Sequence, residues 1–256
     1  MDIITFCSFK GGTAKTSCAL HIAYCLATFH QKRVLLVDFD SQANLSIGMG
    51  LGPDQELTMA NVLLEEKGID EVIQKECMKN LSIIPANAYL DGIERNALLA
   101  SDPYAHERLR RALVPLDYDF VFIDTPPSLG WLTQSAFFAS TGSLICAIPE
   151  AYSVIALRRL KEFHESINRY HEIQLLGIIF SFWNDRGAVN ESFLLEIASC
   201  FPEKLFEAKI RRDITVSRAV LKGKPVHELN EKARASLDYR KVTEEFLEKV
   251  QMGVGV

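Results

Sequence analysis

Short runs of apolar residues alternate along the chain with segments whose apolar residues recur at helical spacing. The apolar runs predict β-strands at residues 3–7, 33–40, 81–85, 120–124, 143–148 and 174–182. The helical spacing predicts helices at residues 18–27, 57–64, 104–113, 154–167 and 231–251. Strands that alternate with helices are typical of βαβ units, so we expect an α/β fold with a mostly parallel central sheet flanked by helices.

Length and composition are consistent with this pattern. The chain has 256 residues, of which 48% are apolar, so it can bury a large core and is most simply one domain over residues 1–256. No apolar run reaches the roughly 18 residues of a membrane span, and no signal peptide is apparent after Met1. We therefore expect a cytoplasmic protein. Its six scattered cysteines form no C-x-x-C pair and indicate reduced thiols.

The first predicted strand leads into a glycine-bearing loop at residues 8–17, and a helix follows. Successive backbone N–H groups in such a loop, together with the positive end of the helix dipole, suit a polyphosphate. Lys15 can then reach the β- and γ-phosphates, and the Thr16 hydroxyl can hold Mg²⁺. The strict P-loop pattern is broken by Phe9 and Ala14 at its two glycine positions. A glycine-rich turn with two solvated lysines is the alternative interpretation of this stretch.

Carboxylates follow two of the buried strands. Asp38 and Asp40 end the second predicted strand, and Asp124 ends the strand that precedes Thr125-Pro126-Pro127. In open α/β sheets ligands bind beyond the carboxyl ends of the strands, so these acids point to the same crevice as the glycine loop. A carboxylate at this position can hold Mg²⁺ through water.

Together these motifs resemble the ParA/MinD class of P-loop ATPases, whose deviant Walker A motif has an additional lysine, here Lys10. The resemblance implies a three-layer P-loop NTPase fold that binds ATP with Mg²⁺, and in this family the additional lysine crosses a dimer interface to the partner's nucleotide. It implies that Asp40 orients the attacking water, that Asp124 and Thr16 hold Mg²⁺ with Asp38 near the metal, and that Lys10 and Lys15 assist catalysis. The implied nucleotide contacts are Lys10, Gly11, Gly12, Thr13, Ala14, Lys15, Thr16 and Ser17, with Asn184 near the adenine. Arg211 stands where the family usually has Pro, which weakens the alignment there.

Residues 209–224 carry six basic side chains and one acidic side chain, although the whole chain has a net charge of −5. Their place matches the surface that ParA proteins use for DNA binding without sequence preference. Doubling this segment in a two-fold dimer gives a basic groove, whereas a solvated helix face is the alternative. The expected DNA contacts are Arg211, Arg212, Arg218, Lys222 and Lys224.

The sequence therefore predicts a ParA-like ATPase that dimerises with ATP, binds DNA nonspecifically and drives plasmid or chromosome partition with a ParB-like partner that stimulates slow hydrolysis. Such a protein is expected on the nucleoid or on plasmid DNA. Because the first predicted strand begins at residue 3, we expect no N-terminal helix-turn-helix domain. A MinD-like membrane ATPase is disfavoured because the C-terminal helix is not basic, so no membrane partner is expected. A nucleotide-gated scaffold with negligible turnover is the second alternative, and a nitrogenase-type reductase is disfavoured because no cysteine closely follows Asp124.

Overall fold

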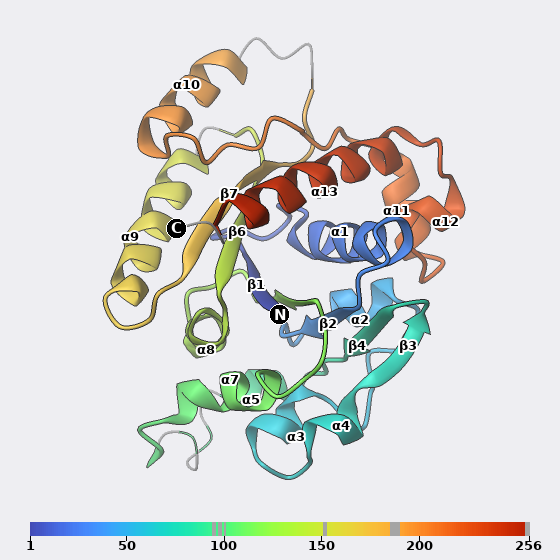
Figure 1. Ribbon diagram of the computed structural model, residues 1–256, viewed down its shortest axis with the longest axis vertical. Coiled ribbons are helices and arrows are strands. Elements are labelled where there is room, and N and C mark those ends of the chain that lie inside the picture. The colour runs from blue at the N-terminus through green and yellow to red at the C-terminus, as the bar shows by residue number, and fades with distance from the viewer. Residues whose placement is uncertain (94–95, 97–98, 100, 151–152, 185–189, 254–256) are drawn as a thin grey trace.

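The computed structural model describes residues 1–93, 96, 99, 101–150, 153–184 and 190–253 (Figure 1). A seven-stranded sheet runs through the molecule in the order β3-β4-β2-β5-β1-β6-β7. Strand β3 pairs antiparallel with β4, and the other neighbouring strands pair in parallel. The strands are β1 (Asp2–Cys7), β2 (Val34–Asp38), β3 (Gln74–Met78), β4 (Leu81–Ile84), β5 (Phe120–Asp124), β6 (Gly142–Ala147) and β7 (Gln174–Phe180).

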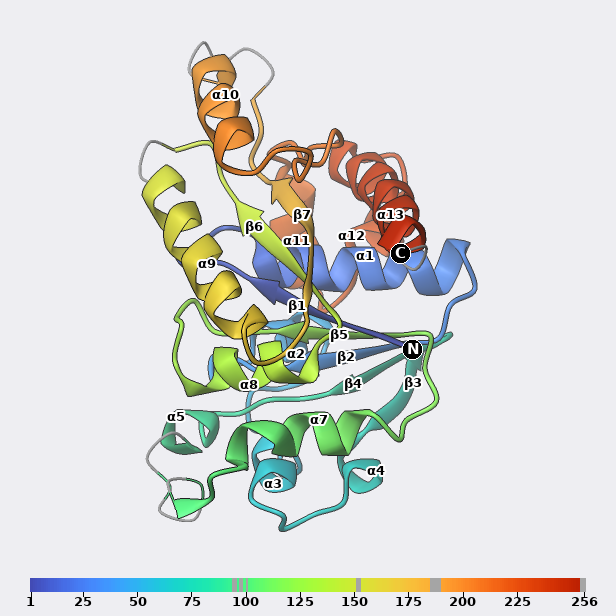
Figure 2. The same cartoon turned by 60° about the vertical axis from the view of Figure 1, so that its left-hand side comes forward.

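One face of the sheet is covered by five helices that surround a large apolar core (Figure 2). Side chains of β1 alternate between the two faces, so Ile4 and Phe6 belong to this core. The five helices are α1 (Lys15–Phe29), α2 (Asn44–Gly48), α11 (Ile214–Val220), α12 (Val226–Leu229) and α13 (Arg234–Gly253).

The other face of the sheet carries the remaining helices over two further apolar clusters, to which Ile3 and Cys7 of β1 contribute. The described chain is therefore layered as helices, sheet and helices, and the predicted α/β fold with a mostly parallel sheet is confirmed. These helices are α3 (Met59–Leu63), α4 (Ile69–Val72), α5 (Leu90–Ile93), η1 (Ala105–Glu107), α7 (Arg108–Leu113), α8 (Trp131–Ala139), α9 (Ser153–Asn168) and α10 (Asn190–Cys200).

The structure differs from the sequence-based elements in several places. The helix expected at residues 104–113 is a 3₁₀ turn followed by α7, and the last helix begins at Arg234 rather than at residue 231. The last predicted strand ends at Phe180, because Phe182 has a left-handed backbone with φ 54°. The side chain of Val154 and residues 254–256 of the C-terminal tail lie outside the described residues.

A buried aromatic cluster joins α1 to α12 and α13. His21 of α1 is fully buried, its ring lies 4.5 Å from the ring of Tyr239, and neither of its nitrogens has a hydrogen-bond partner among the described residues. His227 of α12 lies close by, with Nε2 2.9 Å from the Ser236 carbonyl oxygen. Burial, with a smaller contribution from His227, lowers the pKa of His21 to about 3. The folded protein therefore holds His21 neutral.

This neutral histidine predicts a pH-dependent contribution to stability. Unfolding restores the ordinary pKa of about 6.5, so below that pH the unfolded chain binds a proton that the folded chain excludes. Stability from this group is complete above pH 6.5 and is lost as the pH falls towards 3. The substitution His21→Leu removes this pH-dependent loss. The change that it causes in the free energy of unfolding, relative to the parent, should therefore be about 2 kcal/mol more favourable at pH 5 than at pH 7.5. Urea unfolding at the two pH values measures this difference, and an identical shift at both would contradict it.

Candidate nucleotide-binding site

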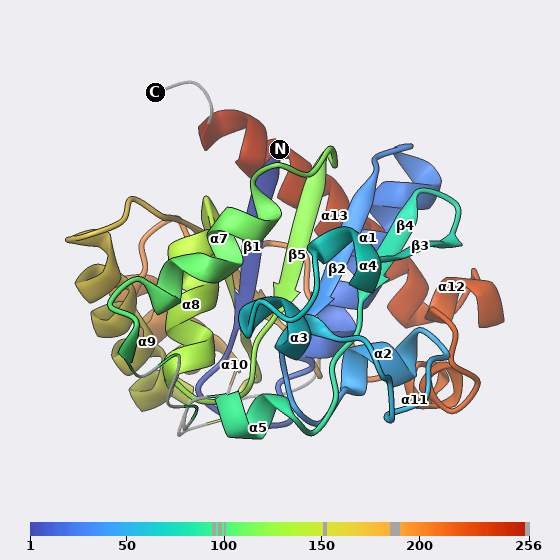
Figure 3. The same ribbon diagram turned by 90° about the horizontal axis from the view of Figure 1, so that it is seen from below.

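The loop between β1 and α1 delivers the amino end of α1 to the carboxyl edge of the sheet. Two residues of the loop have left-handed backbones, Gly12 with φ 77° and Ala14 with φ 62°. Ala14 caps the helix, and its carbonyl oxygen accepts a 2.8 Å hydrogen bond from the N–H of Cys18. The strands β1, β2 and β5 all end at this edge, where α2, α5 and α11 also lie (Figure 3). A helix amino terminus with free N–H groups suits an anion at this edge.

Two residues at the start of α1 bind the carboxylate of Asp124 at the end of β5. Lys15 Nζ lies 2.8 Å from Asp124 Oδ1, and Thr16 Oγ1 donates to Asp124 Oδ2 over 2.6 Å. Lys15 Nζ also donates to the carbonyl oxygen of Thr125. Burial alone would lower the pKa of Lys15, but the Asp124 carboxylate raises it above its usual value, so Lys15 is charged. The predicted lysine and hydroxyl thus both contact the predicted carboxylate.

A cavity of about 380 Å³ opens over this cluster. Asp40 lies on its wall, and Asp40 Oδ1 accepts a 3.1 Å hydrogen bond from the N–H of Gln42. Burial raises the pKa of Asp40. The cavity is lined by Ser8, Lys10, Gly11, Gly12, Thr13, Ala14, Lys15, Thr16, Ser17, Asp40, Gln42, Asn44, Pro127 and Val220.

Asp38 lies beneath this cavity and does not line it. Its side chain is fully buried, and in the sheet it pairs in register with Asp124 of β5. Burial and the nearby Asp124 carboxylate raise the pKa of Asp38 to about 7, against the lowering effect of its hydrogen bonds to Ser46 and Asp40. The two acids thus occupy different positions, because Asp38 is the last residue of β2 whereas Asp40 lies in the loop that follows the strand.

Lys10 extends from the rim of the cavity and pairs with Glu150, which follows β6. Both side chains are about half exposed. Because the pair is exposed to water, its contribution to stability is at most about 1 kcal/mol. Lys10 can therefore exchange this partner at small cost.

The two segments expected beside the adenine lie next to each other. Trp183 and Arg211 form a parallel β-bridge, and the N–H of Trp183 donates to the Ile210 carbonyl oxygen over 3.0 Å. Asn184 follows directly and is exposed. The chain therefore places Asn184 at the carboxyl end of β7, the edge at which the glycine loop lies.

The basic segment at residues 209–224 contains α11 and the turns on either side of it. Arg211 is held by Asp238, whose Oδ2 and Oδ1 accept from Arg211 Nε at 2.9 Å and Nη2 at 2.7 Å. Lys224 Nζ lies 3.7 Å from a carboxylate oxygen of Glu228. The exposed basic side chains of the segment are Arg212, Arg218, Lys222 and Lys224.

The basic segment also touches the end of α2 through two glycines. Gly50 and Gly223 have positive φ angles of 84° and 59°. A Cβ added to Gly223 would lie 2.4 Å from the Cα of Gly50, closer than any side chain can approach. Glycine is therefore required at Gly223 for both its backbone conformation and its contact.

Five residues that line the cavity were not predicted as site residues from the sequence. Ser8 lies at the start of the glycine loop, two residues before the predicted Lys10. Gln42 and Asn44 follow Asp40 in the loop after β2, and Pro127 follows Asp124, so proximity in sequence to the predicted acids could have identified them. Val220 comes from α11, far away in the chain, and nothing in its sequence context indicates the site. Only the fold brings Val220 to the glycine loop.

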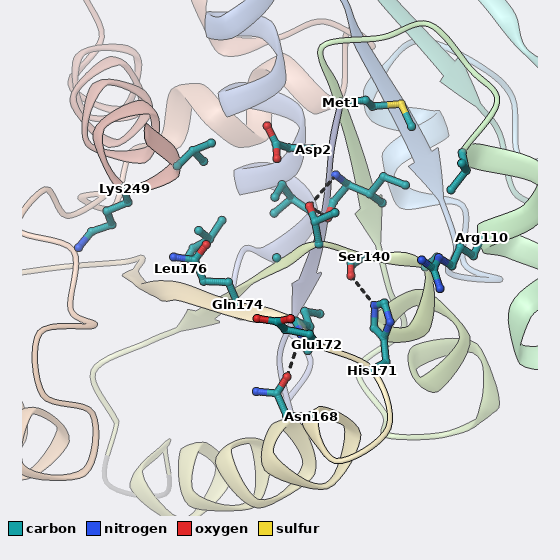
Figure 4. A pocket seen from close by; sticks show the side chains of 18 of the residues that line it. Met1, Asp2, Arg110, Ser140, Asn168, His171, Glu172, Gln174, Leu176 and Lys249 are labelled. Carbon is teal, nitrogen blue, oxygen red and sulfur yellow. Dashed lines mark hydrogen bonds between the residues drawn. The ribbon is translucent and has the colours of Figure 1, made fainter. Parts of the chain in front are cut away.

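A larger cavity, of about 960 Å³, lies at the opposite edge of the sheet (Figure 4). Met1 and Asp2 line it at the start of β1, together with Arg110, His171 and Lys249. None of the predicted site residues lines it. Over the residues that the structure describes, no helix is both long enough and apolar enough to span a bilayer.

The geometry at the carboxyl edge defines a class of protein. A glycine loop opens a helix, and beneath it a lysine and a hydroxyl each lie within 2.8 Å of an oxygen of one strand-end carboxylate. This arrangement, at the edge of a mostly parallel sheet, is that of a P-loop protein built to bind the phosphates of a nucleotide.

Comparison with known proteins narrows this class. A family model described as an AAA domain matches residues 1–176. A ParA family protein of Chlamydia trachomatis serovar D is 51% identical over 96% of this chain and 98% of its own length. The Bacillus subtilis sporulation initiation inhibitor protein Soj is 31% identical over 95% of this chain and 97% of its own length. The Caulobacter vibrioides chromosome partitioning protein ParA is 31% identical over 97% of this chain and 95% of its own length. The chain belongs to the ParA family of partition ATPases.

Solved structures agree with the fold. Cobyrinic acid a,c-diamide synthase from Mycobacterium smegmatis, solved with an ATP analogue and magnesium, matches with a TM-score of 0.85 and 25% identity over 99% of this chain and 97% of its own. A putative plasmid partition protein from Borrelia burgdorferi, bound to AMPPNP, matches with a TM-score of 0.80 and 24% identity over 98% and 99%.

The left-handed Ala14 predicts a stabilising substitution. An alanine in this conformation costs about 1–2 kcal/mol, whereas glycine adopts it freely at a backbone-entropy cost of about 0.5–1 kcal/mol. Ala14→Gly should therefore raise the free energy of unfolding by about 0.5 kcal/mol. As a matched control, Ala19→Gly inside α1 should lower it by more than about 1 kcal/mol. Urea titrations without nucleotide measure both changes, and a destabilised Ala14→Gly protein would contradict strain at this residue.

Proposed function

We propose that this protein is a Mg²⁺-dependent ATPase that dimerises in the ATP state, binds DNA without sequence preference as that dimer, and partitions plasmid or chromosomal DNA together with a ParB-like partner. The observation that carries the proposal is the contact of Lys15 and Thr16 with Asp124 beneath a loop that also bears Lys10. Membership of the ParA family supports the same function.

The residues of the cavity fit ATP with Mg²⁺. Thr13 Oγ1 is buried in the loop and has no hydrogen-bond partner among the described residues, so it is one donor for a phosphate oxygen. Gly11 to Ser17 offer backbone N–H groups, and Lys15 is charged and can exchange Asp124 for phosphate. Oxygen ligands are what Mg²⁺ prefers, and Thr16 and Asp124 supply them. The Asp38 carboxylate lies on the neighbouring strand, in register with Asp124. Bound Mg²⁺ neutralises charge that develops on the phosphates.

Hydrolysis needs a group that orients water at the γ-phosphate, and we assign this role to Asp40. Asp40 is the carboxylate that lines the cavity without a cationic partner within salt-bridge distance among the described residues. Asn184 is assigned to the adenine end of the nucleotide. The loop from Asp124 through Pro127 reaches the cavity and is positioned to sense the γ-phosphate.

Lys10 is assigned a role across the dimer interface. Within its own subunit Lys10 pairs with the exposed carboxylate of Glu150, and exchanging this partner for phosphate oxygens of a second subunit strengthens the dimer only when ATP is bound. ATP then shifts the population from monomer to dimer by the difference in its interaction with the two states.

These assignments make separable predictions for the two lysines. On an Asp40→Ala background, which should bind ATP but not turn it over, Lys10→Ala should retain ATP binding and lose dimerisation. Lys15→Ala should lose ATP binding itself, because Lys15 lies in the cavity of its own subunit. Light scattering with ATP and Mg²⁺ measures the dimer, and titration with a fluorescent ATP analogue measures binding.

Two results would change the proposal. Full dimerisation of the Lys10→Ala protein would remove the role of Lys10 in trans. Parental phosphate release by the Asp40→Ala protein would remove the water-orienting role of Asp40, and no phosphate release by the parent with any DNA or partner would favour a nucleotide-gated scaffold.

DNA binding is assigned to the exposed basic side chains of residues 209–224. Arg211 is engaged by Asp238, so the proposal gives the phosphate contacts mainly to Arg212, Arg218, Lys222 and Lys224. Two copies of this segment in a dimer double the positive charge that faces DNA, which explains why binding should need ATP.

The salt dependence of DNA binding tests this surface. Arg218→Glu removes one phosphate contact in each subunit, so the slope of log affinity against log salt should fall by about two units. The matched control is Lys79→Glu, the same charge reversal at an exposed residue. Lys79 lies in the turn between β3 and β4, outside the basic segment, and does not line the nucleotide cavity. Titrations of labelled duplexes of unrelated sequence, with ATP or ADP at several salt concentrations, give the slopes. Equal slopes for the two variants, equal affinity with ADP, or preference for one duplex would contradict the proposal.

A further inference from the structure

A buried network joins Asp38 to Ser46 of α2. Asp38 Oδ2 accepts two hydrogen bonds from Ser46, from its N–H over 2.8 Å and from its Oγ over 2.7 Å. Asp38 Oδ1 accepts from the N–H of Asp40 over 3.3 Å. Both Asp38 and Ser46 are fully buried, so water does not compete for these hydrogen bonds. A buried carboxylate is costly unless donors such as these satisfy it.

Ser46 extends the network to a third segment of the chain. Its hydroxyl donates to Asp38 and accepts a 3.1 Å hydrogen bond from the N–H of Ala86, which follows β4. Ala86 is also fully buried. One hydroxyl thus joins the end of β2, the middle of α2 and the segment after β4.

The chain between the two ends of this network forms a wall of the nucleotide cavity. Asp40, Gln42 and Asn44 lie between Asp38 and Ser46, and all three line the cavity. Within the loop, Asp40 accepts two hydrogen bonds. Its Oδ1 accepts from the N–H of Gln42 over 3.1 Å, and its carbonyl oxygen accepts from the N–H of Ala43 over 2.9 Å. A short loop whose two ends are held together by hydrogen bonds has few conformations left.

We propose that Ser46 is a positioning residue for ATP hydrolysis, which holds Asp38 and thereby fixes the loop that carries Asp40. Ser46 itself is fully buried and does not line the cavity. The inference rests on the proposed role of Asp40. An orienting group must be held within a fraction of an ångström, so a looser loop costs turnover more than it costs nucleotide binding.

Removal of the hydroxyl tests the inference, because Ser46→Ala keeps the backbone donor to Asp38. This variant should lower kcat about 10-fold, as expected for loss of a hydrogen bond to a charged group, and should leave the dissociation constant for ATP within about 2-fold. Ser46→Thr keeps the hydroxyl and should recover most of the turnover. The matched control is Ser143→Ala, because Ser143 is equally buried but its Oγ has no hydrogen-bond partner among the described residues. Its turnover should equal that of the parent.

Hydrogen exchange gives a second readout that needs no activity. The amide of Ala86 has the Ser46 hydroxyl as its acceptor, so Ser46→Ala should speed its exchange without nucleotide, while the amides of β5 should stay protected. Ser46→Thr should restore protection. If Ser46→Ala loses its cooperative unfolding transition, the test is made with Ser46→Thr instead. Parental turnover of the Ser46→Thr protein supports the inference, and turnover as low as that of Asp40→Ala overturns it.

The outcomes separate this inference from the function on which it rests. If Asp40→Ala abolishes turnover and Ser46→Ala keeps the parental kcat, Ser46 is not a positioning residue although the ATPase assignment stands. If kcat falls equally in Ser46→Ala and Ser143→Ala, the loss is a general effect of removing a buried hydroxyl, and the inference is overturned. If Asp40→Ala keeps the parental turnover, the role of Asp40 fails first.

Discussion

The carboxylate of Asp124 is the interaction on which the site depends. It is fully buried at the end of β5, the central strand of the sheet, and a buried charge of this kind is tolerated only when it is paired. Lys15 and Thr16 from the first turn of α1 supply the pairing. The same contacts fix the position of α1 relative to the sheet, so the loop that precedes α1 is held at the carboxyl edge. Lys15 and Thr16, which contact Asp124, are also the residues to which we assign phosphate and Mg²⁺. The proposed nucleotide site and the packing of α1 on the sheet therefore depend on the same side chains.

The sheet and most of the site could be predicted because their signals are local. Strands β2 and β5 are buried on both faces and are apolar throughout except for their terminal aspartates, and each acid marks the edge where the strand ends. Strand β3 was not predicted, because its five residues are mostly exposed and polar, as an edge strand allows. Helix α11 was not predicted, because it is only seven residues long and Ala219 is its one fully buried residue.

The parts of the site that could not be predicted from the sequence depend on contacts between residues far apart in the chain. Asp38 and Asp40 look equivalent in the sequence. In the structure Asp38 is fully buried and hydrogen-bonded to Ser46, whereas Asp40 lines the cavity. Arg211 looks as basic as Arg212, but Asp238, 27 residues later, holds its guanidinium. Val220 reaches the cavity because α11 packs against α2 in the fold. In each case the partner is set by tertiary packing, to which neither spacing nor composition is sensitive.

The contact of Gly50 with Gly223 leaves no clearance between the end of α2 and the basic segment. Two main chains meet there without a side chain that could change rotamer and absorb a displacement. Packed protein interiors have low compressibility, so a shift of α2 towards this contact displaces the turn that carries Lys222 and Lys224 by a similar distance. We therefore expect the loop after β2 and the turn that carries Lys222 and Lys224 to move together when α2 is displaced towards Gly223.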